Sequence, residues 1–457
     1  MGVLVHELTK KLWGEIGGDG GASDAVSFTG GGELPSAYPV TDLAAASIAA
    51  ASLALSELLS TAIDHSPAVT VDRRLASMWF GMSIRPMGWK LPPVWDAFAG
   101  DYRTHDGWIK LHTNAPHHRA AAMRVLGNHP DRAAMAGAVA TWNATDLETA
   151  IVGEGGCAAA MRSAVEWADH PQGRAVAGEP LAHRRLHDSA PLKNWNIAPE
   201  RPLKGLRVLD LTRVLAGPVA TRFLACFGAD VLRIDPPNWD EPAVVQEVTL
   251  GKRCARLDLH HINDRKIFKE LLSQAHVLVH GYRPTALDRL GLDAATRRAI
   301  APGLVDVSLD AYGWTGPWAT RRGFDSLVQM SSGIADAGMH WREADAPVPL
   351  PVQALDHATG YLMATLVLRG VTQRLRNGRG SEARVSLART AKPLMEASAT
   401  PEPAELAPET DADHSPMIEK TPWGDARRIR PPLHIEGAPM SWDYPATRLG
   451  SNEPRWS

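Results

Sequence analysis

The chain has 457 residues, 44% of them hydrophobic and 22% charged, and this balance excludes a wholly disordered chain, a collagen and a multi-span membrane protein. The 48 basic and 51 acidic residues give a formal net charge of −3, so overall charge does not indicate a nucleic acid or an anionic membrane as partner. Three widely spaced cysteines are too few for a disulfide framework or a zinc site, which indicates a reducing compartment and no bound metal.

The amino-terminal end lacks the basic start and the long apolar core of a signal peptide, and residues 17–32 are rich in glycine. We therefore predict a flexible lead-in over residues 1–33. The apolar stretch 44–59 that follows contains Glu57 and falls short of the ~20 residues needed to span a membrane. It predicts a buried helix in a cytoplasmic protein that does not associate with membranes.

The rest of the chain divides into two blocks and a carboxyl-terminal extension. The blocks meet near a cluster of prolines between residues 190 and 202. The stretch 400–416 is rich in Pro, Glu, Asp and Ala and has almost no bulky apolar residue, which predicts a linker over residues 396–420. We expect the tail that follows, 421–457, to pack on the larger lobe.

The second block alternates short β-prone runs with helical periodicity. Strand–helix–strand units of this kind imply right-handed crossovers between parallel strands. The block therefore predicts an α/β lobe with an open, doubly wound parallel sheet of Rossmann-like type. The expected strands cover 206–211, 231–234, 277–279 and 304–308, and the expected helices cover 220–227 and 265–274.

An internal repeat places an aspartate at the amino-terminal end of two helices rich in Ala and Leu. Asp42 is followed by Ala44-Ala45-Ala46, and Asp356 is followed by Ala358-Thr359-Gly360. An aspartate in this position is most simply a helix N-cap, which stabilises a helix by ~1 kcal/mol. The repeat by itself therefore leaves both a structural and a chemical role open.

The turn over residues 212–218, after the first strand of the second block, has one glycine where a GxGxxG loop needs three, which argues against a bound NAD. The turn still places backbone N–H groups and Arg213 at the carboxyl end of a strand, where open α/β sheets bind ligands. Several basic residues at strand ends suit a ligand that carries several phosphates. The others at comparable positions are Lys252, Arg253, Arg283 and Arg289.

Residues 202–237, PLKGLRVLDLTRVLAGPVATRFLACFGADVLRIDPP, resemble the opening of the family III CoA-transferases, the CaiB/BaiF type. The resemblance continues as far as Thr390 with few gaps, which makes it far more specific than a short motif. The later segments that carry it are Gly251-Lys252-Arg253, Arg289-Leu290-Gly291-Leu292, Tyr312-Gly313-Trp314-Thr315-Gly316-Pro317, Gly323-Phe324-Asp325 and the helix of Asp356.

The order of the halves is unusual. Residues 98–180 resemble the small α/β lobe that normally follows the aspartate helix in this family, yet here they precede the front part. The chain is therefore predicted as a rear-half segment with a small α/β lobe, 34–190, joined to a front-half CoA-binding lobe, 202–395. Because family members form interlocked dimers, the resemblance implies a homo-oligomer or an intrachain pseudo-dimer.

The resemblance implies transfer of CoA from an acyl-CoA to a carboxylic acid through an aspartyl-CoA thioester, with CoA as a substrate and no permanently bound cofactor. Asp356 matches the family's catalytic aspartate. Asp42 matches the same pattern, but its copy lacks the preceding CoA-binding half, so we expect a structural N-cap or a relic. The residues expected to contact CoA are Thr212, Arg213, Ala216, Lys252, Arg253 and Arg289.

Two alternatives remain open from the sequence. A 2-methylacyl-CoA racemase needs two general bases, usually a His with the Asp, but Phe324 stands where the racemases of this family carry that His, which favours a transferase. A catalytically silent CoA-binding protein is the other alternative, since the halves are rearranged. The Trp-rich stretch 79–95 and the small lobe are expected to contact the acyl group, which indicates an apolar or aromatic acid.

Overall fold

The computed structural model describes residues 3–192, 195–397 and 404–457. A seven-stranded sheet lies at its centre in the order β10-β9-β8-β11-β12-β13-β7, with six parallel strands and the antiparallel β7 at one edge. This sheet confirms the predicted α/β class. Its strands are β7 (His183–Ser189), β8 (Arg207–Leu211), β9 (Asp230–Asp235), β10 (Arg253–Arg256), β11 (Val277–His280), β12 (Val305–Asp310) and β13 (Arg379–Ser386).

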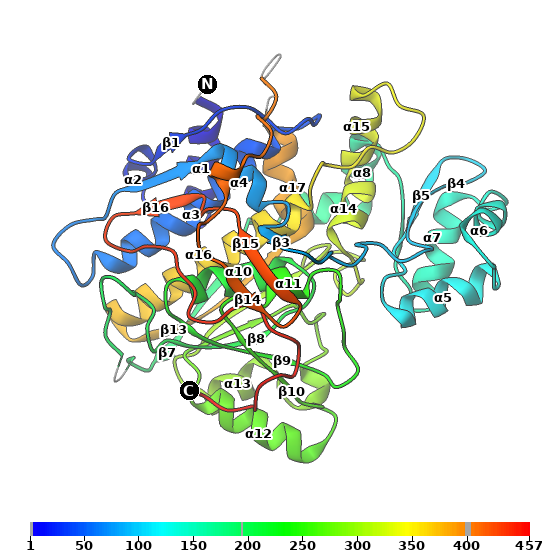
Figure 1. Cartoon of the computed structure of the whole chain (residues 1–457). Helices are drawn as coiled ribbons and strands as arrows, with labels where there is room; N and C mark the ends of the chain where they lie inside the picture. The colour runs from blue at the N-terminus through cyan, green and yellow to red at the C-terminus, as the bar shows by residue number, and fades with distance from the viewer. Residues whose placement is uncertain (1–2, 193–194, 398–403) are drawn as a thin grey trace.

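Both faces of the sheet are buried under helices. Successive side chains along a strand point to opposite faces, so each strand contributes to both apolar layers. Val208 packs into the apolar layer that contains α10 (Ala216–Cys226) and α16 (Ala354–Asn377). Leu209, the next residue, packs into the layer that contains α12 (Ile262–Ser273). Figure 1 shows α12 and α13 on the side of the sheet away from α10 and α16. The hydrophobic runs of the strands therefore supply two core layers.

Helix α3 (Val40–Leu59) packs along α16, so the two aspartate-bearing helices of the repeat lie side by side (Figure 1). In the described part of the chain, α3 is the one helix whose length and apolarity would allow a membrane crossing, and 94% of its most apolar window is buried inside the fold. The prediction of a buried helix is confirmed. On its other side α16 lies so close to the start of α10 that only glycine fits at position 360. A Cβ there would lie 2.4 Å from the carbonyl oxygen of Ala216.

The segment expected to be a flexible lead-in is ordered instead. It forms α1 (Val3–Glu15), α2 (Gly20–Asp24) and β1 (Ser27–Thr29). Leu8 and Leu12 of α1 are buried against α3, and β1 pairs in parallel with β2 (Val69–Asp72). The apolar residues of α1 recur at helical spacing, and this pattern outweighs the neighbouring glycines.

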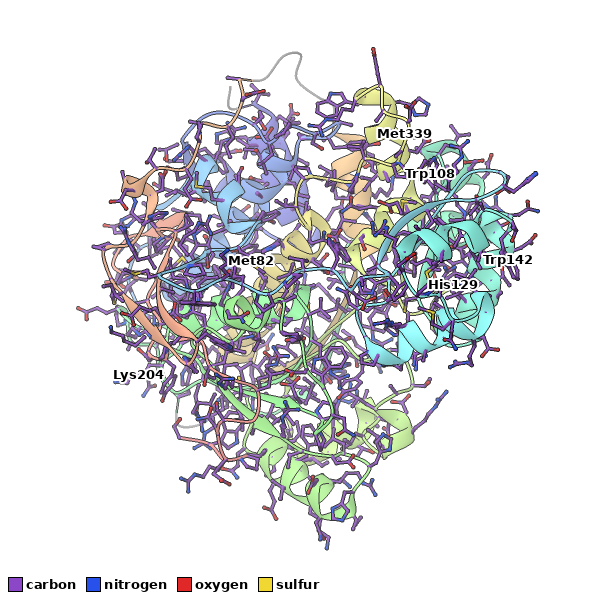
Figure 2. The ribbon with its side chains drawn as sticks, turned by 45° about the vertical axis from the view of Figure 1, so that its right-hand side comes forward. Met82, Trp108, His129, Trp142, Lys204 and Met339 are labelled. Atoms are coloured by element: carbon purple, nitrogen blue, oxygen red, sulfur yellow. The ribbon has the colours of Figure 1, made fainter. Side chains whose placement is uncertain are left out.

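A small lobe covers residues 98–160 and has its own apolar core. Its three-stranded antiparallel sheet has the order β4-β5-β6. In Figure 2 this lobe, marked by Trp108, His129 and Trp142, lies at one side of the molecule. Its elements are β4 (Gly100–Arg103), β5 (Trp108–Leu111), β6 (Ala158–Ala160), α5 (Pro116–Leu126), α6 (Arg132–Val139) and α7 (Ala144–Gly153).

The stretch expected to be a linker is packed where it is described. Residues 398–403 lie outside the described residues. Beyond them, Glu405 forms a β-bridge with Glu33, and Asp413 is held by Arg74 at 2.5 Å. This largely buried ion pair holds the segment against α4, although the segment has few apolar residues.

The carboxyl-terminal segment returns to both halves of the chain. Strand β15 (Gly424–Arg428) pairs with β3 (Ile84–Pro86) and β14 (Glu419–Thr421), and β16 (Leu433–Ile435) pairs with β2. Farther on, the side-chain oxygen of Asn452 accepts a hydrogen bond from the backbone of Cys254 on β10, at 2.9 Å.

The remaining helices are α4 (Arg73–Trp79), α8 (Ala164–Asp169), α9 (Pro171–Ala177), α11 (Val245–Val248), α13 (Ala294–Ile300), α14 (Asp325–Ser332), α15 (Ile334–Trp341) and α17 (Leu387–Glu396), with short 3-10 turns at Asp288–Leu290 and Asp411–Asp413.

Candidate active site

The sheet reverses its winding between β8 and β11, and a cavity of about 380 Å³ opens at the carboxyl ends of these strands. This is the place where open α/β sheets bind ligands. The loops after β8 and β11 contribute Arg213 and Arg283, the last residue of β12 is Asp310, and α5 of the small lobe contributes His117 and His118. The first half of the chain therefore completes a cavity that the second half builds.

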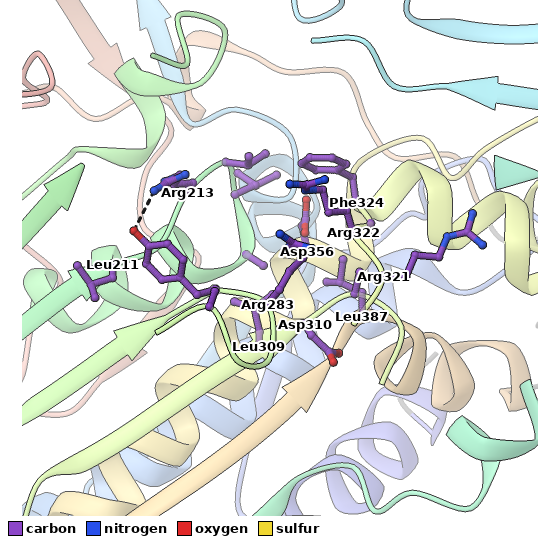
Figure 3. Close-up of a pocket in the computed structure, with 18 of the residues that line it drawn as sticks. Leu211, Arg213, Arg283, Leu309, Asp310, Arg321, Arg322, Phe324, Asp356 and Leu387 are labelled. Atoms are coloured by element: carbon purple, nitrogen blue, oxygen red, sulfur yellow. Dashed lines mark hydrogen bonds between the residues drawn. The ribbon is translucent and has the colours of Figure 1, made fainter. Parts of the chain in front are cut away.

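A second cavity of about 410 Å³ adjoins the first. Asp356, Phe324 and Trp239 line both cavities, together with Val214 and Leu215 of the turn after β8. Asp356 therefore lies at the junction of the two spaces. Figure 3 shows its side chain facing the same space as Arg283, Arg322 and Phe324, whereas Arg321 points away.

Asp356 lies in the first turn of α16 and is 7% exposed. Its backbone N–H donates to the carboxylate of Asp325 at 2.9 Å, and Asp325 is fully buried at the start of α14. Burial and the neighbouring charge of Asp325 raise the pKa of Asp356 well above its ordinary value. Within the described chain no side chain hydrogen-bonds the Asp356 carboxylate, so it is available to a ligand.

Asp42 has the corresponding place in α3 but a different environment. Its Oδ1 lies 2.6 Å from Nη2 of Arg73, and both side chains are buried. Glu33 binds the same guanidinium. Pro39, not Asp42, occupies the N-cap of α3. The prediction that Asp42 is the N-cap is therefore wrong, and Asp42 forms a buried ion pair instead. Neither cavity is lined by Asp42.

The turn after β8 shapes both cavities. Val214 has a φ of 64°, which is a strained conformation for a β-branched residue and is typical of functional sites. Its backbone N–H donates to Oε2 of Glu241 at 2.9 Å, and Glu241 is fixed by Arg233. This buried ion pair stabilises the strained turn.

Arg213 and Ala216, two of the residues predicted to contact CoA, line the first cavity. Nη2 of Arg213 donates to the hydroxyl of Tyr282 at 2.9 Å, and its guanidinium stacks 4.8 Å from the centre of the Trp239 ring. Arg289 is exposed in the turn after β11, close enough for its charge to lower the pKa of Arg283.

Three of the expected CoA contacts lie elsewhere. Lys252 is buried, with Nζ 3.0 Å from Asp210. Thr212 is also buried and donates to Asp210 at 2.5 Å. Arg253 lies on the edge strand β10 and pairs with Asp230 at 2.7 Å. These residues hold the strands and the turn together and do not line the first cavity, which therefore gives no support to their predicted role in CoA binding.

Arg322 and His118 line the first cavity but were not predicted from the sequence, and Arg283 was predicted only as one of several basic residues that suit a ligand with phosphates. Arg283 and Arg322 make no ion pair with any described carboxylate, and the same holds for Arg213 and Arg289. Burial is the main cause that lowers the pKa of Arg283, and the charge of Arg322 adds to it. Cations that are crowded together without a carboxylate favour an anionic ligand. Sequence could have pointed to the adjacent arginines before Gly323, but not to His118, which reaches the cavity from another lobe.

Asp310 is a second carboxyl group of the first cavity, at the end of β12. Its Oδ1 accepts from the backbone of Gly313 at 2.9 Å, while its buried Oδ2 has no partner among the described residues. Burial, with a contribution from Glu179, raises the pKa of Asp310 to about 8. The folded protein therefore keeps this group protonated at neutral pH.

We expect Asp310→Asn to become progressively stabilising, relative to the native chain, as pH rises from about 4 to about 8. In this range the unfolded chain ionises Asp310 but the folded chain does not, so the native chain loses about 1.4 kcal/mol of stability per pH unit from this group. The amide preserves shape and removes this dependence. Urea unfolding at pH 5, 6, 7 and 8 measures the difference, and a difference that does not change with pH would contradict the expectation.

Together, the fold and the site define an α/β protein with a cationic ligand cavity at the switch point of its sheet and a buried carboxylate beside it. Residues 203–418 match the family model described as CoA-transferase family III. This region therefore belongs to the family III CoA-transferases, and the family predicted from the sequence is confirmed.

Relatives with similar sequences are also named as CoA transferases. Acetyl-coenzyme A transferase nodX of Hypoxylon pulicicidum is 34% identical over 216 residues, covering 46% of this chain and 36% of the relative. Succinyl-CoA:glutarate CoA-transferase of Mus musculus is 35% identical over 195 residues, covering 39% and 44%. The solved structure of Rv3272 from M. tuberculosis is 30% identical and covers 42% of this chain and 57% of that one, with a TM-score of 0.39. The chain thus spans about a third to a half of the length of these curated relatives.

Proposed function

We propose that this chain transfers CoA from an acyl-CoA to a carboxylic acid, with Asp356 as the nucleophile. The observation that carries the proposal is the place of Asp356, a buried carboxylate without a side-chain partner at the junction of a cationic and an apolar cavity. Burial removes the water that would solvate the carboxylate, and the start of α10 beside it favours negative charge that develops in the reaction.

The proposed reaction has two symmetrical halves. A carboxylate oxygen of Asp356 attacks the thioester carbonyl, and the CoA thiolate leaves an acyl-aspartyl anhydride behind. The thiolate then attacks the aspartyl carbonyl, so that the donor acid leaves and an aspartyl-CoA thioester remains. An acceptor carboxylate repeats these steps in reverse order, which forms the new acyl-CoA and restores Asp356.

The cationic cavity is proposed to hold the CoA phosphates. Arg213, Arg283, Arg289 and Arg322 supply guanidinium groups that no described carboxylate neutralises. Arg213 is further oriented by Tyr282 at 2.9 Å. Arginine suits phosphate because its planar fork offers parallel N–H donors.

Asp325 is proposed as a positioning residue. Its carboxylate accepts the backbone N–H of Asp356, and Gln329 donates to its other oxygen. This arrangement fixes the first turn of α16 and keeps a negative charge close to the nucleophile. Burial and, to a lesser extent, this charge raise the pKa of Asp356, which makes the ionised nucleophile more basic.

The two halves of the chain are proposed to act as an intrachain pseudo-dimer. The aspartate helix of the first half packs on that of the second, and the small lobe of the first half contributes His117 and His118 to the site. In this view residues 34–190 supply the lobe that covers the site, and residues 202–395 supply the CoA cavity and the nucleophile.

A trapping experiment tests the proposed chemistry. The protein is incubated with an acyl-CoA, quenched with hydroxylamine and digested, and peptides are mapped by mass spectrometry. We expect a hydroxamate on Asp356 that requires the acyl-CoA. CoA binding without any adduct, and without release of free acid, would instead support the catalytically silent alternative.

A racemase remains the second candidate because His112 lines the second cavity with Asp356. The His112 ring stacks on Phe324 with ring centres 3.8 Å apart, so an imidazole lies next to the side chain that replaces the expected histidine. Burial lowers the pKa of His112 to about 4, which leaves it a neutral base. Exchange of the α-proton of 2-methylacyl-CoA in deuterated water, without an aspartyl adduct, would support this candidate.

A further inference from the structure

We infer that the second cavity selects acyl groups with a neutral, apolar tail and rejects those with a second carboxylate. This inference rests on the proposed function, because it assigns the second cavity to the acyl group and the first to CoA. The residues that line the second cavity would then favour monocarboxylic over dicarboxylic acyl groups.

Two loops from different halves of the chain form the apolar walls. The segment 92–95, before the small lobe, faces the segment 242–244, before α11. Pro, Val, Ala and Trp make up both segments. Trp95 is 39% exposed and Val94 is 47% exposed, so two adjacent large apolar side chains that line the cavity are open to solvent, as is typical of ligand-binding grooves. Cover by an acyl chain would remove this surface from water.

The charged side chains that line the second cavity are all acids. Its described lining residues include no Lys or Arg, and its ionisable acids are Asp96, Asp240, Glu241 and Asp356. His112 adds no positive charge near neutral pH, because burial lowers its pKa to about 4. Arg213, Arg283 and Arg322, which make no ion pair with a described carboxylate, line the first cavity instead.

The polar groups of the second cavity are already occupied or offer no cation. Asp96 accepts from the hydroxyl of Thr113 at 2.7 Å and pairs with Arg119 at 3.3 Å. Glu241 accepts from Trp239 at 3.1 Å as well as from Arg233. The cations beside the lining residues are therefore already paired with carboxylates, as Lys110 is with Asp101. A carboxylate on the acyl tail would lose its hydration, find no unpaired basic side chain among the described lining residues and lie among like charges. A terminal methyl group could instead pack on the two apolar segments.

The test compares two thioesters that differ only at the end of a four-carbon acyl group. Butyryl-CoA ends in a methyl group and succinyl-CoA in a carboxylate. We expect the rate constant for formation of the Asp356 adduct, per unit of thioester concentration, to be on the order of 100-fold higher for butyryl-CoA. Equal reactivity, or a preference for succinyl-CoA, would overturn the inference and leave the proposed function intact.

A matched pair of variants tests the role of the cavity wall. Ala243→Arg places a cation in the wall of the second cavity, and we expect it to reduce the preference for butyryl-CoA at least about tenfold. Val165→Arg adds the same cation on α8, where Val165 is 72% exposed and lines neither cavity, and should leave the ratio unchanged. An equal effect of both variants would show that general charge, not the cavity, sets the preference.

A binding measurement separates this inference from the transfer reaction. The unreactive thioethers butyl-CoA and 3-carboxypropyl-CoA carry the same two chain ends and can be titrated into the native protein by calorimetry. We expect tighter binding of butyl-CoA by on the order of 100-fold, whether or not an aspartyl adduct ever forms. If the preference appears without any adduct, the selectivity stands and the proposed transfer fails, whereas equal affinities would refute the selectivity.

Discussion

Asp356→Asn should reduce CoA transfer by at least about 10⁴-fold while the protein remains folded. The amide has the size of the carboxylate but cannot attack a thioester, and loss of a covalent nucleophile has effects of this order or larger. Its backbone N–H still donates to Asp325. Because burial and Asp325 already raise the pKa of Asp356, a neutral side chain should fit the site without loss of stability. Steady-state transfer rates and thermal unfolding measure the two effects.

Asp42→Asn provides the matched control in the neighbouring helix. It removes the same charge from the other copy of the repeat, where Arg73 lies 2.6 Å away. We expect it to lower the unfolding temperature, because a buried guanidinium loses one partner, but to retain transfer below that temperature. Loss of transfer in Asp42→Asn with activity kept in Asp356→Asn would exchange the roles of the two aspartates.

The second large effect concerns stability. Glu247 on α11 is fully buried and binds Arg222 of α10 and Arg428 of β15, the latter at 2.9 Å. It also accepts from the backbone and hydroxyl of Ser83, at 3.0 and 2.8 Å. One carboxylate thus joins three segments that are far apart in the sequence. Glu247→Gln should lower the free energy of unfolding at pH 7 by about 3–5 kcal/mol, because buried Arg222 loses its counter-charge and Arg428 keeps only Glu419.

The pH dependence of this effect has a defined sign. Burial opposes ionisation of Glu247, but the charges of Arg222 and Arg428 prevail and lower its pKa to about 2. The stabilisation is therefore complete above the ordinary pKa near 4.5 and is lost as pH falls from there towards 2. The deficit of Glu247→Gln in urea unfolding should shrink below pH 4.5.

Glu154→Gln provides the control for this second prediction. Its partner is Arg124, and both side chains are about half exposed, so the substitution should cost at most about 1 kcal/mol. A loss at Glu247 no larger than the loss at Glu154 would contradict the role given to the buried network.

The α/β lobe could be predicted from sequence because its strands and helices carry local periodicity, as Leu206–Leu211 does. The site was predictable only in part, since the functional state of a charged residue depends on distant partners. Sequence shows Lys252 beside Arg253, but not that Asp210, far back in the chain, neutralises it. It shows Asp42 and Asp356 as equivalents, but not that Arg73 folds back onto the first of them. His118 likewise reaches the site only through the placement of the small lobe.

The antiparallel edge strand has a consequence for how the chain can be divided. β7 precedes the region 203–418, yet it pairs with β13 and closes the sheet. A fragment limited to that region would expose β13 as an open edge of eight residues and uncover the face of α16 on which α3 lies, and both surfaces invite self-association. The region that matches the family model is therefore smaller than the unit that packs together in this structure, and we expect two separately made halves to need each other to cover these surfaces.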